Sequence, residues 1–211
     1  MSYDLIAFTL SCLLIALYYV YLHIKTRRLP DSSVHAFNAR VRERWVGMII
    51  GKDNMEVLAI QTLRNSVMAA NFMATTAILL IIGTLNLSEK IGQWALDWHP
   101  LAYPMSGDLW QIKLGLLLLD FSIAFYCFSM AIRFYNHVGY LINLPEDTPT
   151  DSGHYKQTCV YLNRAGGYYT VGNRTFFFSL PIIMWFFGPY FLMLATVTLI
   201  AGLAALDKAP R

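Results

Sequence analysis

The sequence predicts an all-α integral membrane protein with four transmembrane helices and additional amphipathic helices at the membrane interface. Of its 211 residues, 56% are hydrophobic and only 14% are charged, whereas soluble domains carry about 25% charged residues. Four apolar runs reach the length of about 20 residues that a helix needs to cross a hydrocarbon layer of about 30 Å. Most of the Lys and Arg residues lie in two connections between these runs. We therefore expect residues 1–211 to form a single membrane domain.

The first predicted span, residues 5–22, lacks the basic start and the small-residue cleavage site of a signal peptide, so we expect a retained anchor. The second and third spans are residues 66–85 and 109–131. The fourth run, residues 176–206, is longer than one straight span requires and contains Pro181 and Gly188–Pro189. A division at Gly188 would leave a first piece of about 12 residues, too short to cross alone, so we predict one tilted or kinked helix. A partly re-entrant segment over residues 176–188 is the alternative.

The distribution of basic residues predicts the orientation. The connections 23–65 and 132–175 contain twelve of the 16 Lys and Arg residues, and the rest of the chain contains four. By the positive-inside rule, both connections lie in the cytoplasm and both termini lie on the non-cytoplasmic side. An even number of spans agrees with this arrangement.

The first cytoplasmic connection is predicted to contain an amphipathic helix. Ser32–Ser33 can cap it, and apolar residues recur every three or four positions from Val34 to Met48. Such a helix can lie in the membrane interface with its basic side toward anionic head groups, or pack against the underside of its own bundle, and both can hold. Asp53–Asn54 can cap a new helix that leads into the second span. The residues predicted to contact lipid are Arg40, Arg42, Arg44 and Trp45.

Two further short helices are expected in the connections. On the outer side, Ser88 can cap an amphipathic stretch that extends to Trp98. In the second cytoplasmic connection, a helix from His154 to Leu162 is predicted to end at Ala165–Gly167.

Polar residues occur within the predicted spans, where they are costly. Asp120 lies near the middle of the third span, and a charged group at that depth costs at least about 3 kcal/mol. Its helical face carries small residues, so we expect Asp120 to point into a helix contact. Gln61, Arg64 and Asn71 follow one side of the second helix. Together the four residues either form a path for an ion or proton, or bond to one another and fix helix register, and we favour the structural interpretation.

Enzyme chemistry is hard to build from this sequence. The five His and three Cys residues are scattered and match no metal-binding spacing. The glycine-rich stretch 165–172 lacks the lysine of a phosphate-binding loop, and no nucleophile motif occurs. We therefore expect no enzyme activity, no cofactor and no metal. A net charge of +3 gives no indication of a nucleic-acid partner.

Several short motifs carry a resemblance to a known family. They are Arg44–Trp45, Asp53–Asn54, residues 133–136, residues 172–181 and residues 185–189. With the order of the spans, they make the chain similar to the membrane proteins grouped as domain of unknown function 599. This resemblance implies four spans, no established activity and no catalytic residue. It marks as family-like, mostly at the cytoplasmic helix ends, Arg44, Trp45, Asp53, Asn54, Arg133, Asn136, Arg174, Trp185 and Pro189.

For function, we favour a non-enzymatic role as a self-associating protein or an accessory subunit of a larger membrane complex, with the bacterial inner membrane as the expected location. Four helices bury little internal surface, so polar groups facing lipid need partners from elsewhere. One alternative is a small ion or proton channel or transporter that uses Asp120 and the polar side of the second helix. A second alternative is a protein that binds anionic lipid through its basic interfacial helix.

Overall fold

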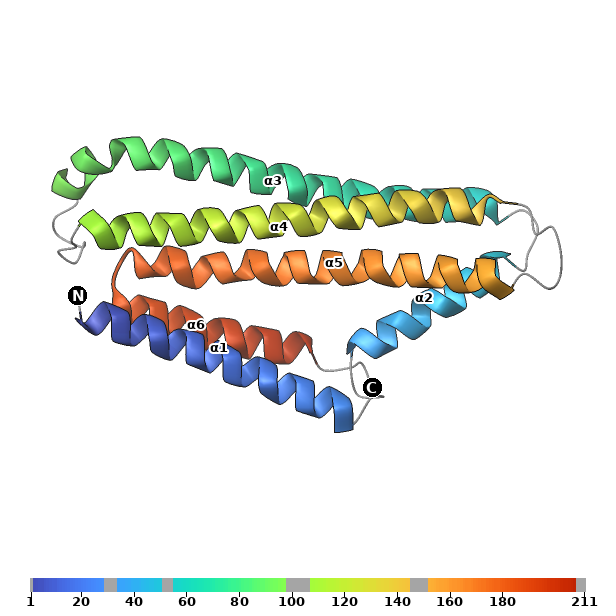
Figure 1. Ribbon diagram of the computed structural model, residues 1–211, viewed down its shortest axis with the longest axis horizontal. Coiled ribbons are helices and arrows are strands. Elements are labelled where there is room, and N and C mark those ends of the chain that lie inside the picture. The colour runs from blue at the N-terminus through green and yellow to red at the C-terminus, as the bar shows by residue number, and fades with distance from the viewer. Residues whose placement is uncertain (1, 29–33, 51–54, 98–106, 145–151, 208–211) are drawn as a thin grey trace. The chain divides into compact units, whose positions relative to one another are not determined.

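The computed structural model describes residues 2–28, 34–50, 55–97, 107–144 and 152–207, all of them helical apart from short turns (Figure 1). These ranges contain six helices and no strand. The predicted fold class is therefore confirmed. The helices are α1 (Ser2–Arg28), α2 (Val34–Ile50), α3 (Glu56–Asp97), α4 (Gly107–Ile142), α5 (Ser152–Trp185) and α6 (Pro189–Leu206).

Four helices are long and apolar enough to cross a membrane: Tyr3–Arg28 in α1, Glu56–Leu87 in α3, Leu109–Ile142 in α4, and Pro189–Leu206 in α6. In the most apolar window of each, only 11% to 33% of the residues are buried. Most of their surface therefore faces outward. Apolar composition on an outward face is what a lipid environment requires.

Three helices exceed the length of one membrane crossing. α3 has 42 residues, α4 has 36 and α5 has 34. At about 1.5 Å per residue, α3 measures about 63 Å, twice the hydrocarbon thickness of about 30 Å. Each of these helices therefore contains residues that lie outside the hydrocarbon.

The short helices predicted at Ser88 and at His154–Leu162 are wrong in their boundaries. α3 continues through residue 88 to Asp97, and α5 continues through Ala165–Gly167 to Trp185. A glycine in a helix costs only about 1 kcal/mol relative to alanine, so helix packing can outweigh it. Gly166 and Gly172 are both buried in α5, which shows that their lack of a side chain is used for close packing.

The structure divides into two compact units. Unit 1 comprises residues 1–34, 78–122 and 174–211, and unit 2 comprises residues 35–77 and 123–173. α1 and α6 belong to unit 1, and nearly all of α2 belongs to unit 2. Each of the long helices α3, α4 and α5 contributes one part to each unit.

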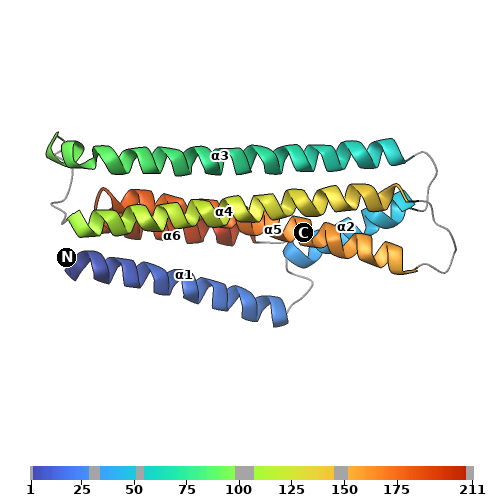
Figure 2. The same cartoon turned by 45° about the horizontal axis from the view of Figure 1, so that its top comes forward.

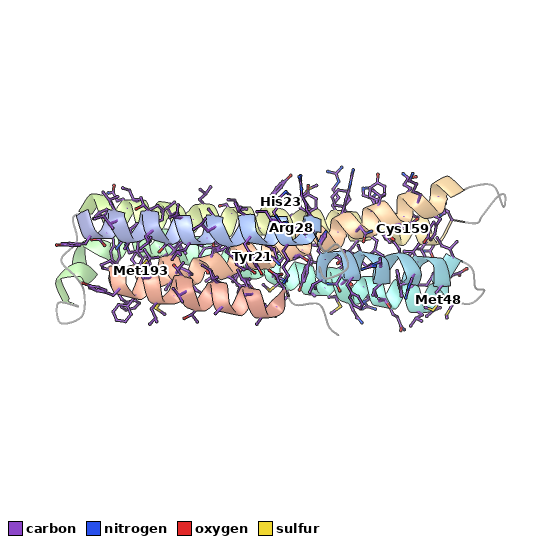
Figure 3. All side chains as sticks on the ribbon, turned by 90° about the horizontal axis from the view of Figure 1, so that it is seen from below. Tyr21, His23, Arg28, Met48, Cys159 and Met193 are labelled. Atoms are coloured by element: carbon purple, nitrogen blue, oxygen red, sulfur yellow. The ribbon has the colours of Figure 1, made fainter. Side chains whose placement is uncertain are left out.

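The core of unit 1 forms where α1 and α6 lie side by side, next to the end of α5 (Figure 1). Trp185 is 1% exposed and packs against Ala7 and Leu192. The Phe8 ring stacks on the Trp185 ring, with 4.8 Å between the ring centroids. On α6, Met193 (labelled in Figure 3) accepts a hydrogen bond from Ser11 Oγ at 3.3 Å.

The core of unit 2 is built from four helices, each of which contributes two residues. α2 lies against the first half of α5 in this unit (Figures 1 and 2). Trp45, Met55, Tyr135 and Tyr161 are among the residues that pack around the core. Its buried residues are Val46, Ile49, Ala59, Leu63, Val138, Ile142, Cys159 and Leu162.

The single helix predicted over residues 176–206 is wrong. α5 ends at Trp185, and α6 begins at Pro189 after a turn at Gly188, whose φ is 139° and ψ is 168°. Residues with a side chain rarely adopt this conformation, and proline suits the first position of a helix because its missing N–H needs no partner there. Pro181, in contrast, lies within α5 without ending it. Residues 176–185 do not need to cross the membrane alone, because they are the end of α5, which begins at Ser152.

The extra helix changes where the chain ends lie in unit 1. Near its start, α1 contacts the end of α5 through Asp4 and Trp185, and near its end it contacts Asp207, just after α6, through Tyr18. α1 and α6 therefore run in the same direction. The start of α1 and the end of α6 lie at opposite ends of unit 1, which disagrees with the prediction of both termini on one side.

The amphipathic helix predicted after Pro30 is confirmed as α2, Val34–Ile50. Its proposed cap, Ser32–Ser33, lies outside the described residues, and so does the proposed cap of the next helix, Asp53–Asn54.

Candidate functional site

Asp120 lies on a buried face of α4, as the small residues around it predicted. It is 8% exposed, and Ala124, Cys127 and Ala131 on the same face are buried with it. Its Oδ2 atom is buried and has no hydrogen-bond partner among the residues that the structure describes. An unpaired buried carboxylate is costly, so this position needs either a proton or a partner.

The other three residues of the predicted path have exposed side chains. Gln61, Arg64 and Asn71 are exposed on α3 and belong to unit 2, whereas Asp120 belongs to unit 1. At 100° per residue, Gln61 lies opposite the buried residues of α3, whereas Arg64 and Asn71 lie about 95° to 120° from the centre of the buried face. The buried residues are Ala59, Leu63, Ala70, Ala74 and Ala77.

Sequence reasoning missed an ionic cluster at one end of unit 1. Lys113 of α4 is fully buried, and its Nζ donates a hydrogen bond of 2.8 Å to the Trp185 carbonyl oxygen. The same Nζ lies 3.8 Å from Asp4 Oδ1 and 4.6 Å from the centroid of the Trp185 ring. Trp185 Nε1 in turn donates to Asp4 Oδ1 at 3.3 Å. The only signal in the sequence was a lysine placed within an otherwise apolar run.

A second ion pair lies at the opposite end of unit 1. Arg174 of α5 pairs with Asp207, the residue that follows α6, and Tyr18 of α1 donates a hydrogen bond of 2.5 Å to Asp207 Oδ2. This end also carries the last turns of α1, from which His23 and Arg28 project into the surroundings (Figure 3). The two polar clusters lie at opposite ends of the apolar contact between α1 and α6.

The family-like residues at the predicted cytoplasmic ends are divided between the two units. Arg174 belongs to unit 1 and pairs with Asp207. Trp45 packs beside the core of unit 2, while Arg44, Arg133 and Asn136 are exposed. Asp53 and Asn54 lie outside the described residues.

α2 has two different faces. Val46 and Ile49 are buried in the core of unit 2, so the packing interpretation holds for this face. Three of the apolar residues whose spacing predicted the helix remain exposed, whereas Trp45 packs beside that core. Phe37 is 39% exposed, Val41 48%, and Met48, labelled in Figure 3, 39%.

The arginines of α2 divide in the same way. Arg40 and Arg44 are exposed, whereas Arg42 is half-buried against α5. Arg42 Nε donates a hydrogen bond of 2.8 Å to Asn163 Oδ1, and Asn163 Nδ2 donates to Glu43 Oε1 at 3.1 Å. Burial lowers the pKa of the Arg42 guanidinium.

A polar pocket of about 390 Å³ opens on unit 2. α3 contributes most of its lining, and α4 and α5 contribute one tyrosine each. Sequence reasoning did not find it, because its residues come from three helices and follow no motif. The lining residues are Thr62, Asn65, Ser66, Ala69, Tyr135 and Tyr169. Within the described ranges, no three His, Cys, Asp or Glu side chains gather in a way that could hold a metal ion.

Comparison with known proteins gives one family. A search of curated proteins and a search of solved structures produced no match. The sequence model of the family described as "Protein of unknown function, DUF599" matches residues 6–211, nearly the whole chain. This agrees with the resemblance carried by the short motifs and with the four apolar helices. The chain therefore belongs to the DUF599 family.

Proposed function

We propose that the protein is a non-enzymatic membrane protein that assembles with a second copy of itself through the outward face of α3. The observation that supports this proposal is the position of Asn71. It is exposed inside the candidate span Glu56–Leu87 and has no hydrogen-bond partner among the described residues. Lipid tails cannot satisfy an amide, so a protein partner is the expected solution.

A second copy suits this face because an asparagine amide both donates and accepts hydrogen bonds. In a parallel two-fold contact, Asn71 would meet Asn71 of the partner, and each amide would satisfy the other. Hydrogen bonds between membrane helices of this kind contribute about 0.6–2 kcal/mol. Met68 and Thr75, both exposed about one turn away on the same face, would pack around this pair. Gln61 and Arg64 extend the face toward the start of α3.

The test compares Asn71→Leu with Asn65→Leu, which alters an exposed asparagine on another side of the same helix. Native mass spectrometry in mild detergent should show a dimer for the wild type and for Asn65→Leu, and a monomer for Asn71→Leu. With the native cysteines replaced by serine, Met68→Cys should form a disulfide between copies, whereas Leu80→Cys should not. A monomeric wild type, or a dimer that Asn71→Leu leaves intact, would contradict the proposal. An accessory subunit would instead retain a different protein in an Asn71-dependent complex.

A second candidate function is a path for protons or ions, and the unpartnered Oδ2 of buried Asp120 favours it. Reconstituted vesicles should then show a flux that Asp120→Asn reduces at least about tenfold, because the ionisable group would be lost. Ser122→Ala, which alters an exposed hydroxyl two residues away, should leave the flux unchanged. Absence of flux in the wild type across common monovalent cations and protons would remove this candidate.

Binding of anionic lipid is a third candidate, favoured by the exposed apolar residues of α2 beside Arg44. Such a helix would bind vesicles that contain anionic lipid, and binding would weaken as salt rises. Arg44→Gln should reduce binding, and salt-insensitive binding would contradict the candidate.

For the orientation, we propose that the protein lies in a bacterial inner membrane, with the start of α1 on the non-cytoplasmic side and the end of α6 in the cytoplasm. α1 ends with Lys25, Arg27 and Arg28, which the positive-inside rule assigns to the cytoplasm. Because Asp207 lies at that same end of unit 1, it follows them to the cytoplasmic side, and this orientation requires α5 to cross the membrane in addition to the four candidate spans.

A further inference from the structure

Arg42 is held in place by a chain of hydrogen bonds that leaves part of its guanidinium unused. Its Nε bonds to Asn163, and Asn163 is itself fixed by Glu43. No carboxylate in the described part of the chain lies within salt-bridge distance of Arg42. The Glu43 carboxylate acts on Arg42 electrostatically but bonds to Asn163 instead of to the guanidinium, so the remaining N–H groups of Arg42 are available to an anion in direct contact.

Gly166 on α5 makes this position of the arginine possible. A Cβ atom at residue 166 would lie 2.7 Å from Arg42 Nη1 and 2.9 Å from its Cζ, too close for contact. The guanidinium therefore lies directly on the helix backbone. The neighbouring Gly167 has open space around its own Cβ position. Any side chain at 166 would displace the guanidinium, whereas one at 167 would not.

α5 links the polar pocket to this arginine, because Tyr169, which lines the pocket, lies about one helical turn after Gly166. The Arg42 guanidinium is within electrostatic reach of the Tyr135 hydroxyl, which lines the pocket. The hydroxyls of Tyr135 and Tyr169 and the amide of Asn65 have no hydrogen-bond partner within the described structure. Thr62 and Ser66 donate to their own helix backbone and keep acceptor lone pairs. The lining contains hydroxyls and an amide but no carboxylate.

We propose that this site in unit 2 binds a phosphorylated small molecule, with its phosphate group on Arg42 and its remainder in the pocket. A guanidinium matches the geometry of phosphate oxygens and can bond to two of them at once. Phenol hydroxyls and an amide donate further hydrogen bonds to such a group. The volume of about 390 Å³ is larger than a phosphate ion needs and lies within the range of small-ligand pockets, about 300–1,000 Å³. The proposal is independent of self-association.

The test uses the full-length protein in detergent and follows its thermal unfolding with inorganic phosphate, glycerol 3-phosphate or glycerol. Glycerol 3-phosphate should raise the Tm by about 2–6 °C at saturation, and glycerol should not. The same protein in nanodiscs of phosphatidylglycerol or phosphatidylcholine tests a lipid head group as the source of the phosphate. Stabilisation in phosphatidylglycerol alone assigns the phosphate to a lipid. Stabilisation by glycerol 3-phosphate assigns it to a soluble ligand.

Two matched pairs of variants examine the assignment. Arg42→Gln should weaken binding at least about tenfold, whereas Arg133→Gln, at an exposed arginine of α4, should not change it. Gly166→Ala should weaken binding, and Gly167→Ala should retain it. If Arg42→Gln fails to fold, Arg42→Lys keeps the charge but loses the two-point geometry, and it should bind more weakly than the wild type. Equal effects of Arg42→Gln and Arg133→Gln, or no stabilisation by any phosphate compound or lipid, would overturn the proposal.

Discussion

Lys113 of α4 donates a hydrogen bond of 2.8 Å to the carbonyl oxygen of Trp185, the last residue of α5. The same carbonyl accepts from the Gly188 N–H at 3.2 Å, within the turn that leads to α6. Carbonyl groups at the end of a helix have no intrahelical partner. The buried lysine therefore donates a hydrogen bond to a carbonyl that lost its helical partner where the chain breaks at Gly188. Asp4 of α1 accompanies the lysine and joins a third helix to this end.

We expect Lys113→Met to destabilise the protein by about 3–5 kcal/mol, because it leaves Asp4 buried next to an apolar side chain. Thermal unfolding in detergent measures the change, and Lys156→Met, at an exposed lysine of α5, is the control. Adding Asp4→Asn to Lys113→Met should recover part of the loss. Equal stability of the single variant and the wild type would contradict the assigned ion pair.

Gly188→Ala should destabilise the protein by about 1–3 kcal/mol, because an alanine at φ 139° is strained. Gly202→Ala on α6 is the matched control. Its Cβ would meet no atom within 4 Å, so the helix should gain about 0.5–1 kcal/mol. The difference in denaturation midpoint between the two variants measures the cost of an alanine in the turn at residue 188. A Gly188→Ala variant as stable as Gly202→Ala would mean that α5 and α6 form one continuous helix.

Gly172→Ala should also be destabilising, by about 1–3 kcal/mol, because its Cβ would lie 2.9 Å from the buried Phe128 ring. Gly167→Ala, five residues earlier on α5, has open space and should be neutral or slightly stabilising. Unfolding of the Gly172→Ala and Gly167→Ala variants by guanidinium or heat measures their stabilities. The difference distinguishes steric overlap from the general effect of alanine in a helix. Similar behaviour of both variants would contradict the packing of α4 on α5 in unit 2.

The proposed orientation predicts that a fluorescent protein fused after Arg211 is fluorescent in a bacterial host, because it folds in the cytoplasm. Alkaline phosphatase fused at the same place should be inactive, since that enzyme requires the periplasm. A cysteine introduced at Ser2 should react with an impermeant maleimide in intact spheroplasts. Active phosphatase at the C-terminus would instead restore the prediction of both termini outside.

Local patterns in the sequence predicted features that lie within a single helix, such as its position and its buried face. The spacing of apolar residues from Val34 to Met48 predicted α2, which extends from Val34 to Ile50. The small residues near Asp120 indicated a buried face, and Asp120 is buried. Spacing did not reveal which face of α2 packs. That face includes Arg42, whose partner Asn163 lies 121 residues away in the chain.

Contacts between distant segments could not be predicted. Lys113 and Trp185 are 72 residues apart, and Asp4 and Trp185 are 181 apart, so no short motif connects them. The break at Gly188 was missed because the length of residues 176–187 was weighed alone. The preceding residues from Ser152 onward already belong to the same helix and make it long enough.

The length of α3 has a practical consequence. α3 has 42 residues and measures about 63 Å, so about half of its length extends beyond the hydrocarbon layer. A dye attached near Glu56 would therefore escape quenchers carried on acyl chains, while a dye at Leu79 would be reached by them. The excess length is divided between the two ends of α3: about 15 Å precedes the predicted span at residue 66, and the remainder follows the span.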